Sequence, residues 1–159
     1  MTSSPPGGTP LRVQRILAPT DFSPGAEPAL QWAMGLADRF GARVTLLHVL
    51  DLSLGALAGL SPDVAAMPAT IELAERVRAD AQEQMRRLAA RFPDATPVLR
   101  EGTARAAIID VAKEIGADLI VMGTHGRTGL AKVFFGSVAE HVVRHSPVPV
   151  LTVRQTSAS

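Results

Sequence analysis

The chain has 159 residues, of which 47% are hydrophobic, which is enough for one hydrophobic core but not for two comfortable ones. Its 16 basic and 15 acidic side chains leave a formal charge of +1, so electrostatics favour neither nucleic acid nor a membrane as partner. The absence of cysteine excludes disulfides, thiolate metal sites and thiol catalysis. No leader-like segment or membrane-spanning apolar run is recognisable, and we therefore expect a cytoplasmic protein.

The two ends of the chain are predicted to lie outside the folded domain. Residues 1–12 are rich in Pro, Gly, Ser and Thr and carry too little apolar surface to offset the entropy of ordering, which predicts a disordered tail. Residues 155–159 form a short C-terminal tail. The single domain then covers residues 13–154, with a variable and mobile segment at 51–70 that is a candidate lid or partner surface.

The first half of the domain alternates between strand and helix patterns. A strand is expected over residues 16–18, and Ser23 is expected to cap a helix that runs to Phe40 and ends at Gly41. A second strand covers residues 43–50. A long helix over residues 70–92 has a solvated face rich in Glu and Arg. Its apolar stripe has helical spacing and consists of Ile71, Ala74, Val77, Ala81, Met85 and Leu88.

The second half continues the alternation. A short strand is predicted over 97–100, a helix over 103–115, and an apolar strand over 117–122 that is typical of a parallel strand buried on both faces. In the next helix, 137–145, Ser137 and Glu140 have the spacing of a capping box. This alternation predicts an α/β fold with one open, doubly wound, parallel five-stranded sheet in a single domain.

The last strand is expected over residues 148–153, at an edge of the sheet. Pro147 and Pro149 cannot donate hydrogen bonds to a neighbouring strand, which restricts this segment to an edge position. An exposed apolar edge tends to pair with another chain, so residues 148–153 predict a homodimer interface.

A glycine pattern marks the candidate ligand site. Gly123 and Gly126 follow the apolar strand, and Gly136 precedes Ser137 at the start of a helix. The N-terminus of a helix presents backbone N–H groups and a positive dipole end to an anion, and glycine lets backbone approach a ligand closely. The pattern therefore indicates a phosphate site, while two ordinary glycine turns around a loop remain the alternative.

The spacing Gly-x-x-Gly, nine residues, then Gly-Ser resembles the nucleotide-binding members of the universal stress protein family. The resemblance extends to residues 15–23, 45–49 and 146–153 and covers most of 13–154. It implies the strand order 3-2-1-4-5 and dimers formed through the last strand. In that order the strands are added outward in opposite directions from the first and fourth strands, and open α/β sheets bind their ligands at such a point.

The resemblance also implies roles for individual residues, each with an alternative. Asp21 would contact the adenosine half of a nucleotide, or cap the turn before the first helix. The Ser137 hydroxyl would join the phosphate contacts or cap its helix, and Val49 and Met122 would meet the adenosine or only fill the core. The candidate nucleotide-binding residues are Pro19, Thr20, Asp21, Val49, Met122, Gly123, Gly126, Gly136, Ser137 and Val138.

We therefore expect a protein that binds ATP, with Mg or Mn bridging the phosphates, and that acts as a nucleotide-dependent switch in stress response or signalling. The alternatives are a nucleotide-independent dimeric interaction protein of the same fold and a slow ATP hydrolase. No nucleophilic triad or positioned base is recognisable, so at most weak ATPase activity is expected. His48 is interpreted as a satisfied core residue, and His125 as either a ligand contact or a loop support.

Overall fold

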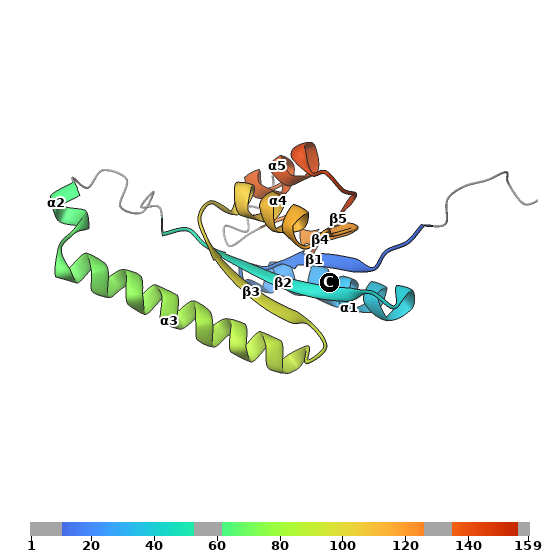
Figure 1. Ribbon diagram of the computed structural model, residues 1–159, viewed down its shortest axis with the longest axis horizontal. Coiled ribbons are helices and arrows are strands. Elements are labelled where there is room, and N and C mark those ends of the chain that lie inside the picture. The colour runs from blue at the N-terminus through green and yellow to red at the C-terminus, as the bar shows by residue number, and fades with distance from the viewer. Residues whose placement is uncertain (1–10, 53–61, 126–134, 156–159) are drawn as a thin grey trace, which may run out of the picture.

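The computed structural model describes residues 11–52, 62–125 and 135–155. Five parallel strands form one sheet in the order β3-β2-β1-β4-β5, which confirms the expected fold and strand order (Figure 1). The strands are β1 (Arg15–Pro19), β2 (Arg43–Leu50), β3 (Thr96–Glu101), β4 (Leu119–Gly123) and β5 (Val150–Val153). β5 lies at one edge of the sheet, as its two prolines predict.

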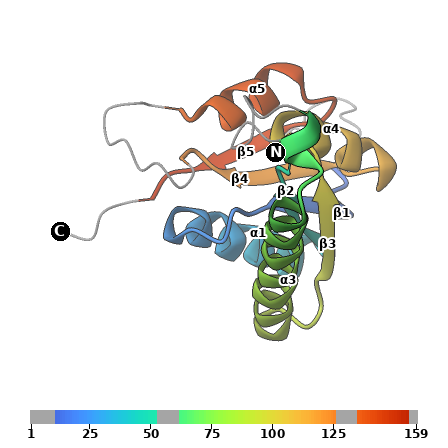
Figure 2. The same cartoon turned by 90° about the vertical axis from the view of Figure 1, so that its left-hand side faces the viewer.

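The helices cover both faces of this sheet, as a doubly wound fold requires. Helices α1 and α3 lie on one face, and α4 and α5 lie together on the other (Figure 2). The helical segments are η1, a 3₁₀ turn (Pro24–Ala26), and α1 (Glu27–Phe40), α2 (Pro62–Ala65), α3 (Pro68–Arg91), α4 (Ala104–Glu114) and α5 (Ser137–His145).

The central strand β1 separates two apolar clusters. Ile16 and Ala18 point into the cluster formed with α1 and α3, while Leu17 points into the cluster formed with α4 and α5. All three side chains are completely buried. Because successive side chains of a strand alternate between faces, a strand covered on both sides must be apolar at every position.

Two predicted helix caps are wrong. Ser23 precedes the 3₁₀ turn η1 rather than α1 directly, and its side chain makes no capping bond. The predicted capping box of Ser137 and Glu140 is also absent, because Gly136 holds the N-cap position and Ser137 is already helical. Helix α5 nevertheless spans Ser137–His145, as predicted, and the amide of Gly136 before it donates to the carbonyl oxygen of Thr124 over 2.7 Å.

Strand β5 begins at Val150 rather than at residue 148. The segment before it still touches the sheet, since the Ile120 amide donates to the carbonyl oxygen of Pro149 over 3.0 Å. Proline lacks the N–H that a regular ladder needs, and this shortens the strand. Helix α3, in contrast, begins earlier than expected, at Pro68.

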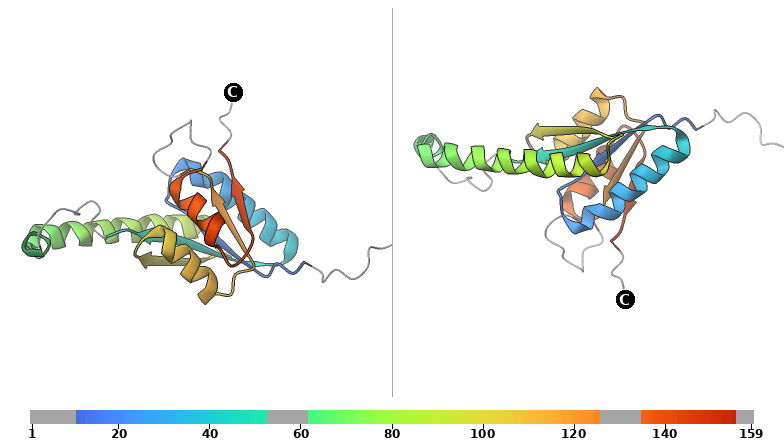
Figure 3. Two further views of the ribbon diagram at one scale, coloured as in Figure 1. Left: turned by 90° about the horizontal axis from the view of Figure 1, so that it is seen from above. Right: turned by 90° about the horizontal axis from the view of Figure 1, so that it is seen from below.

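Helix α3 is longer than the sheet that it covers. Ala81, Met85 and Leu88 are buried against the sheet as predicted, but the side chains of Ile71 and Val77 are 50% and 41% exposed. The N-terminal half of α3 projects past the ends of β2 and β3, as Figure 3 shows from above and below. The apolar stripe therefore has the predicted period, but only its C-terminal half meets the core.

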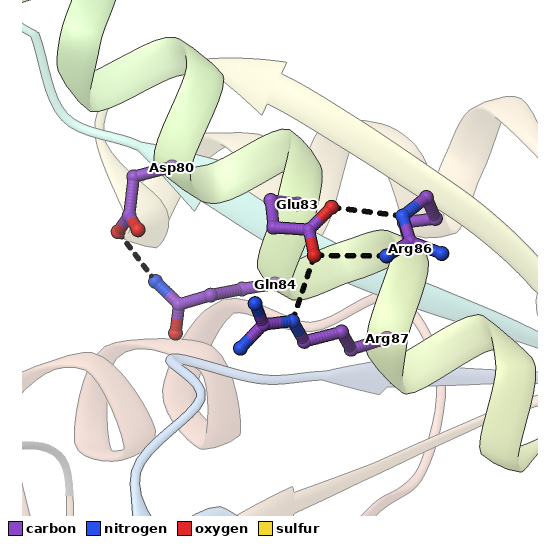
Figure 4. Close-up of polar contacts among 5 residues, drawn as sticks. All are labelled: Asp80, Glu83, Gln84, Arg86 and Arg87. Atoms are coloured by element: carbon purple, nitrogen blue, oxygen red, sulfur yellow. Dashed lines mark hydrogen bonds and ion pairs between the residues drawn. The ribbon is translucent and has the colours of Figure 1, made fainter.

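The outer face of α3 is charged, as predicted. Glu83 accepts hydrogen bonds from Arg86 and Arg87, and Gln84 donates to Asp80 (Figure 4). The two arginines hold the pKa of Glu83 at about 2, well below its ordinary value of 4.5. Because these groups are exposed, their ion pairs contribute little to the stability of the fold and mainly keep this face of the helix hydrated.

Several predictions fall outside the described residues. These are the N-terminal tail at 1–10, residues 53–61 of the variable segment, Gly126 of the glycine pattern, and the C-terminal residues 156–159. Within the three described ranges, no helix is both long enough and apolar enough to cross a membrane.

Candidate functional site

A pocket of about 250 Å³ opens at the carboxyl ends of β1, β2 and β4 and is closed by the first turns of α4 and α5. It lies where the chain order of the strands reverses, between β1 and β4. Every predicted site residue that the structure describes lines this pocket. These residues are Pro19, Thr20, Asp21, Val49, Met122, Gly123, Gly136, Ser137 and Val138.

The first wall is the turn that follows β1. The Thr20 amide donates to the carbonyl oxygen of Leu47 over 2.8 Å, which extends the pairing of β1 and β2 by one residue. Asp21 Oδ1 then accepts from the amide of Ser23 over 2.9 Å and from the Ser23 hydroxyl. Asp21 therefore does hold its own turn, and its contact with adenosine stays a prediction.

The second wall is the end of β4, where backbone packs against backbone. A Cβ atom on Gly123 would lie 3.0 Å from the carbonyl oxygen of Gly25, in the turn η1. This approach is tighter than nearly all real Cβ contacts, so a side chain on Gly123 would require the Gly25 backbone to shift. This packing constraint on Gly123 is independent of any phosphate.

The third wall is the first turn of α5, which Thr124 ties to the sheet. Thr124 is buried, its amide donates to Val153 over 3.1 Å, and its carbonyl oxygen accepts from Gly136 over 2.7 Å. The amide of Gly136 is thus already paired, which corrects the expectation that it faces a phosphate. The amides of Ser137 and Val138 belong to the first turn of a helix, which has no acceptor for them within the helix.

The remaining wall is mainly apolar. It combines side chains from the ends of β2 and β4 with the start of α4, which the crossover from β3 brings over the sheet. The pocket residues that sequence reasoning did not assign to the site are Ala26, Leu47, His48, Ala104, Ile108, Thr124, His125 and Ala139. An apolar wall opposite helix N–H groups suits a ligand with a flat ring at one end and negative charge at the other.

The sequence marks some of these additional residues better than others. No sequence pattern marks Ala104 and Ile108 as pocket residues, because only the crossover of the chain places α4 over the pocket. Thr124 and His125 lie inside the glycine pattern, and the Thr124 hydroxyl lies 2.9 Å from Nδ1 of His125. This contact favours loop support for His125, the second of its two interpretations.

The other histidines do not form a metal centre. His48 is a satisfied core residue, as predicted, because it is buried and its Nδ1 lies 2.8 Å from the carbonyl oxygen of Thr20. His141 and His145 stack with ring centroids 4.2 Å apart. Loss of hydration, together with His145 and Arg105, lowers the pKa of His141. Among the described residues, no three His, Asp or Glu side chains are grouped to hold a metal ion.

Comparison with known proteins identifies the family. Residues 12–154 match the model of the universal stress protein family. The chain belongs to this family. It is 32% identical over 160 residues to universal stress protein MJ0577 of Methanocaldococcus jannaschii, a match that covers 91% of this chain and 97% of the relative.

Solved structures agree with this assignment. Universal stress protein UspA from Lactobacillus plantarum superposes with a TM-score of 0.79 at 32% identity, covering 90% of this chain and 99% of that protein. A universal stress protein solved in complex with cAMP superposes with a TM-score of 0.59 at 22% identity, covering 91% and 99% of the two chains. The second comparison shows that the two proteins share a fold.

Proposed function

We propose that the pocket binds an adenine nucleotide, ATP, and that this universal stress protein acts as a nucleotide-dependent switch in stress response or signalling. The observation that carries the proposal is the pairing of an apolar wall with the N–H groups of a helix start across the β1–β4 crevice. A protein that shares this fold has been solved in complex with cAMP, an adenine nucleotide, which supports the proposal at the level of the fold.

Each part of the pocket has a role in this proposal. The backbone of Ser137 and Val138 would donate to the phosphates, with Gly123 and Gly126 leaving room for them. Asp21 would accept from a ribose hydroxyl or the adenine amine. The lining residues Pro19, Thr20, Val49 and Met122 would enclose the adenosine half.

A divalent cation, Mg or Mn, would bridge the phosphates. Among the described pocket residues, Asp21 has the only carboxylate, the type of side chain that binds Mg²⁺. No three such side chains are grouped there. Phosphate oxygens and water would therefore provide most of the ligands, which is the usual manner of binding for Mg²⁺ at nucleotides.

Binding rather than hydrolysis is favoured by the contacts of the titratable pocket residues. Asp21 bonds to Ser23, His48 to Thr20, and His125 to Thr124. A general base must be positioned to take a proton from the water that attacks the phosphate, whereas Asp21 is assigned here to the adenosine half and the two histidines hold residues of the pocket wall. A slow ATP hydrolase is thus the weaker alternative, and accumulation of ADP above that of a Gly136→Val control would favour it.

We also propose that the protein is a cytoplasmic homodimer joined through β5. The four residues of β5 are all partly exposed, and one edge of the strand faces away from β4. An open strand edge is completed most simply by the same strand of a second copy. A dimeric interaction protein that needs no nucleotide would use the same edge, so the ligand experiment decides between the two functions.

The proposed function is tested on the freshly purified protein. Mass spectrometry of the small molecules released by denaturation should detect ATP or a related adenine nucleotide. Calorimetric titration of the emptied protein with ATP and Mg²⁺ should then show one site per chain. Absence of released nucleotide together with absence of a titration signal would leave the nucleotide-independent interaction protein as the better function.

A further inference from the structure

The turn between β1 and η1 contains a strained residue. Phe22 has a φ of 61°, and among the non-glycine residues of the described ranges it is the one with a positive φ. A bulky side chain rarely adopts this left-handed conformation, because its Cβ then crowds the backbone. Such a residue persists only where surrounding contacts hold it, and it directly follows Asp21.

His48 contacts this turn on both sides of Asp21. Its Nδ1 lies 2.8 Å from the carbonyl oxygen of Thr20, and its ring lies against the ring of Phe22 with centroids 4.1 Å apart. A carbonyl oxygen can only accept, so Nδ1 carries the hydrogen and donates it. The Phe22 amide also donates to the Thr20 hydroxyl over 3.0 Å, which closes the turn.

The imidazole supports the turn from the face of the sheet opposite to α4 and α5. Leu47 packs into the cluster with α4 and α5, whereas Val44 and Leu46 pack into the cluster with α1 and α3, as does Phe22. Because side chains alternate along β2, His48 points to the same face as Leu46. Its side chain is therefore placed to act on the turn, while the α5 amides lie on the other face.

We infer that His48 is a positioning residue of the nucleotide site, which fixes Asp21 toward the adenosine half by holding Thr20 and Phe22. This rests on the proposed function, because Asp21 can be positioned for adenosine only if adenosine binds here. Loss of the Nδ1 donor leaves the buried Thr20 carbonyl without that partner and lets the strained φ of Phe22 relax. The Asp21 carboxylate then loses its fixed place, while the phosphate end at α5 is unaffected.

Three variants test the inference. His48→Phe keeps an aromatic ring against Phe22 but cannot donate, whereas His48→Asn keeps an N–H near the place of Nδ1. Val44→Ala, in the same strand and buried, is the control for a general loss of stability. Calorimetry with ATP and with tripolyphosphate gives the two affinities, and a thermal melt of each variant gives its stability.

His48→Phe should weaken ATP binding by about tenfold and leave tripolyphosphate binding within about twofold, the scale of one lost buried hydrogen bond. His48→Asn should recover most of the ATP affinity, and Val44→Ala should lower the melting temperature without changing either affinity. The inference is overturned if His48→Phe binds ATP as wild type does. It is also overturned if the affinities for ATP and tripolyphosphate fall together in step with the melting temperature.

Hydrogen exchange separates failure of this inference from failure of the proposed function. The amides of residues 20–23 should exchange faster in His48→Phe than in His48→Asn or Val44→Ala, with or without nucleotide. If wild type binds no adenine nucleotide, the proposed function is wrong and the assignment of His48 to nucleotide positioning fails with it. If wild type binds ATP but exchange at 20–23 is equal in all three variants, only the role of His48 is overturned.

Discussion

The carbonyl oxygen of Gly25 lies 3.0 Å from the place that a Cβ atom would take on Gly123, so the turn after β1 and the end of β4 meet without side chains between them. Gly136 is in a different situation. Its φ of −69° and ψ of 156° are open to any residue, and its amide already bonds to Thr124. Different constraints therefore act on Gly123 and Gly136.

Substitution by valine should separate these constraints. Gly123→Val should lower the free energy of unfolding by about 1–3 kcal/mol, the usual cost of overpacking, and should weaken ATP binding as well. Gly136→Val should weaken ATP binding, because Gly136 lines the pocket at the phosphate end, and should lower the melting temperature less than Gly123→Val, because only its preference for the N-cap position is lost. Thermal melts and calorimetric titrations measure both quantities. Unchanged ATP affinity in both variants would contradict the phosphate interpretation of the glycine pattern.

The type and order of the elements could be predicted because they depend on local periodicity. The apolar run at Leu119–Met122 and the alternation of helices and strands specify buried parallel strands irrespective of distant contacts. The edge position of β5 followed from Pro147 and Pro149 in the same way. These patterns act within a few residues, and the structure confirms them.

The details that could not be predicted depend on contacts between distant segments. The N-cap of α5 is Gly136, whose amide bonds to Thr124, and the close approach at Gly123 comes from a turn at residue 25. Helix α3 leaves the sheet near Arg78, which pairs with Glu101 at the end of β3 over 2.6 Å. No local pattern reveals that the apolar stripe continues beyond this point, past Val77 to Ile71, without a core to cover it.

The ion pairs on the outer face of α3 should be visible in the pH dependence of stability. Hydrogen bonds from Arg86 and then Arg87 lower the pKa of Glu83 from 4.5 to about 2. A carboxyl group whose pKa is lower in the folded state contributes stability above its unfolded pKa and loses it as the pH falls through the folded one. The contribution of Glu83 should therefore be complete above pH 4.5 and decline toward about pH 2.

The measurement compares melting temperatures of wild type and Glu83→Gln across this range. The variant should melt slightly lower at neutral pH, with a small difference because the pair is exposed, and the two curves should converge as the pH approaches 2. Nuclear magnetic resonance of the Glu83 carboxyl carbon reports its pKa directly. If Glu83 in the wild type titrates near pH 4.5, its hydrogen bonds to the two arginines do not form in solution.

Strand β5 should mediate dimer formation through alternate backbone groups. The carbonyl oxygens of Pro149 and Val153 accept from β4, so the peptide groups of Val150 and Thr152 point away from the sheet. Thr152→Pro removes one outward N–H and should shift the protein toward monomer, as should the charge of Val150→Lys. Thr152→Ala keeps the N–H and should remain dimeric. A wild-type protein that sediments as a monomer at micromolar concentration would refute the interface.

Binding of the two ends of the proposed nucleotide can be tested separately by substituting one residue at each end of the pocket. Asp21→Ala should weaken ATP binding by about 1–3 kcal/mol and leave tripolyphosphate binding nearly unchanged, because the lost charged acceptor serves the adenosine half. Its melting temperature should also fall, since Asp21 Oδ1 accepts from the amide of Ser23. Asp21→Asn keeps an oxygen acceptor for that amide and should restore the melting temperature more than the ATP affinity.

Ser137→Ala is the matching change at the phosphate end. Ser137 makes no capping bond to its helix, so the variant should melt as wild type does and weaken ATP and tripolyphosphate binding together. Calorimetry with both ligands and a thermal melt of each variant complete the comparison. If Asp21→Ala binds ATP like wild type while melting several degrees lower, Asp21 only holds its turn and the adenosine assignment is wrong. A lower melting temperature for Ser137→Ala would instead indicate that the Ser137 hydroxyl caps the helix, a bond that the structure does not contain.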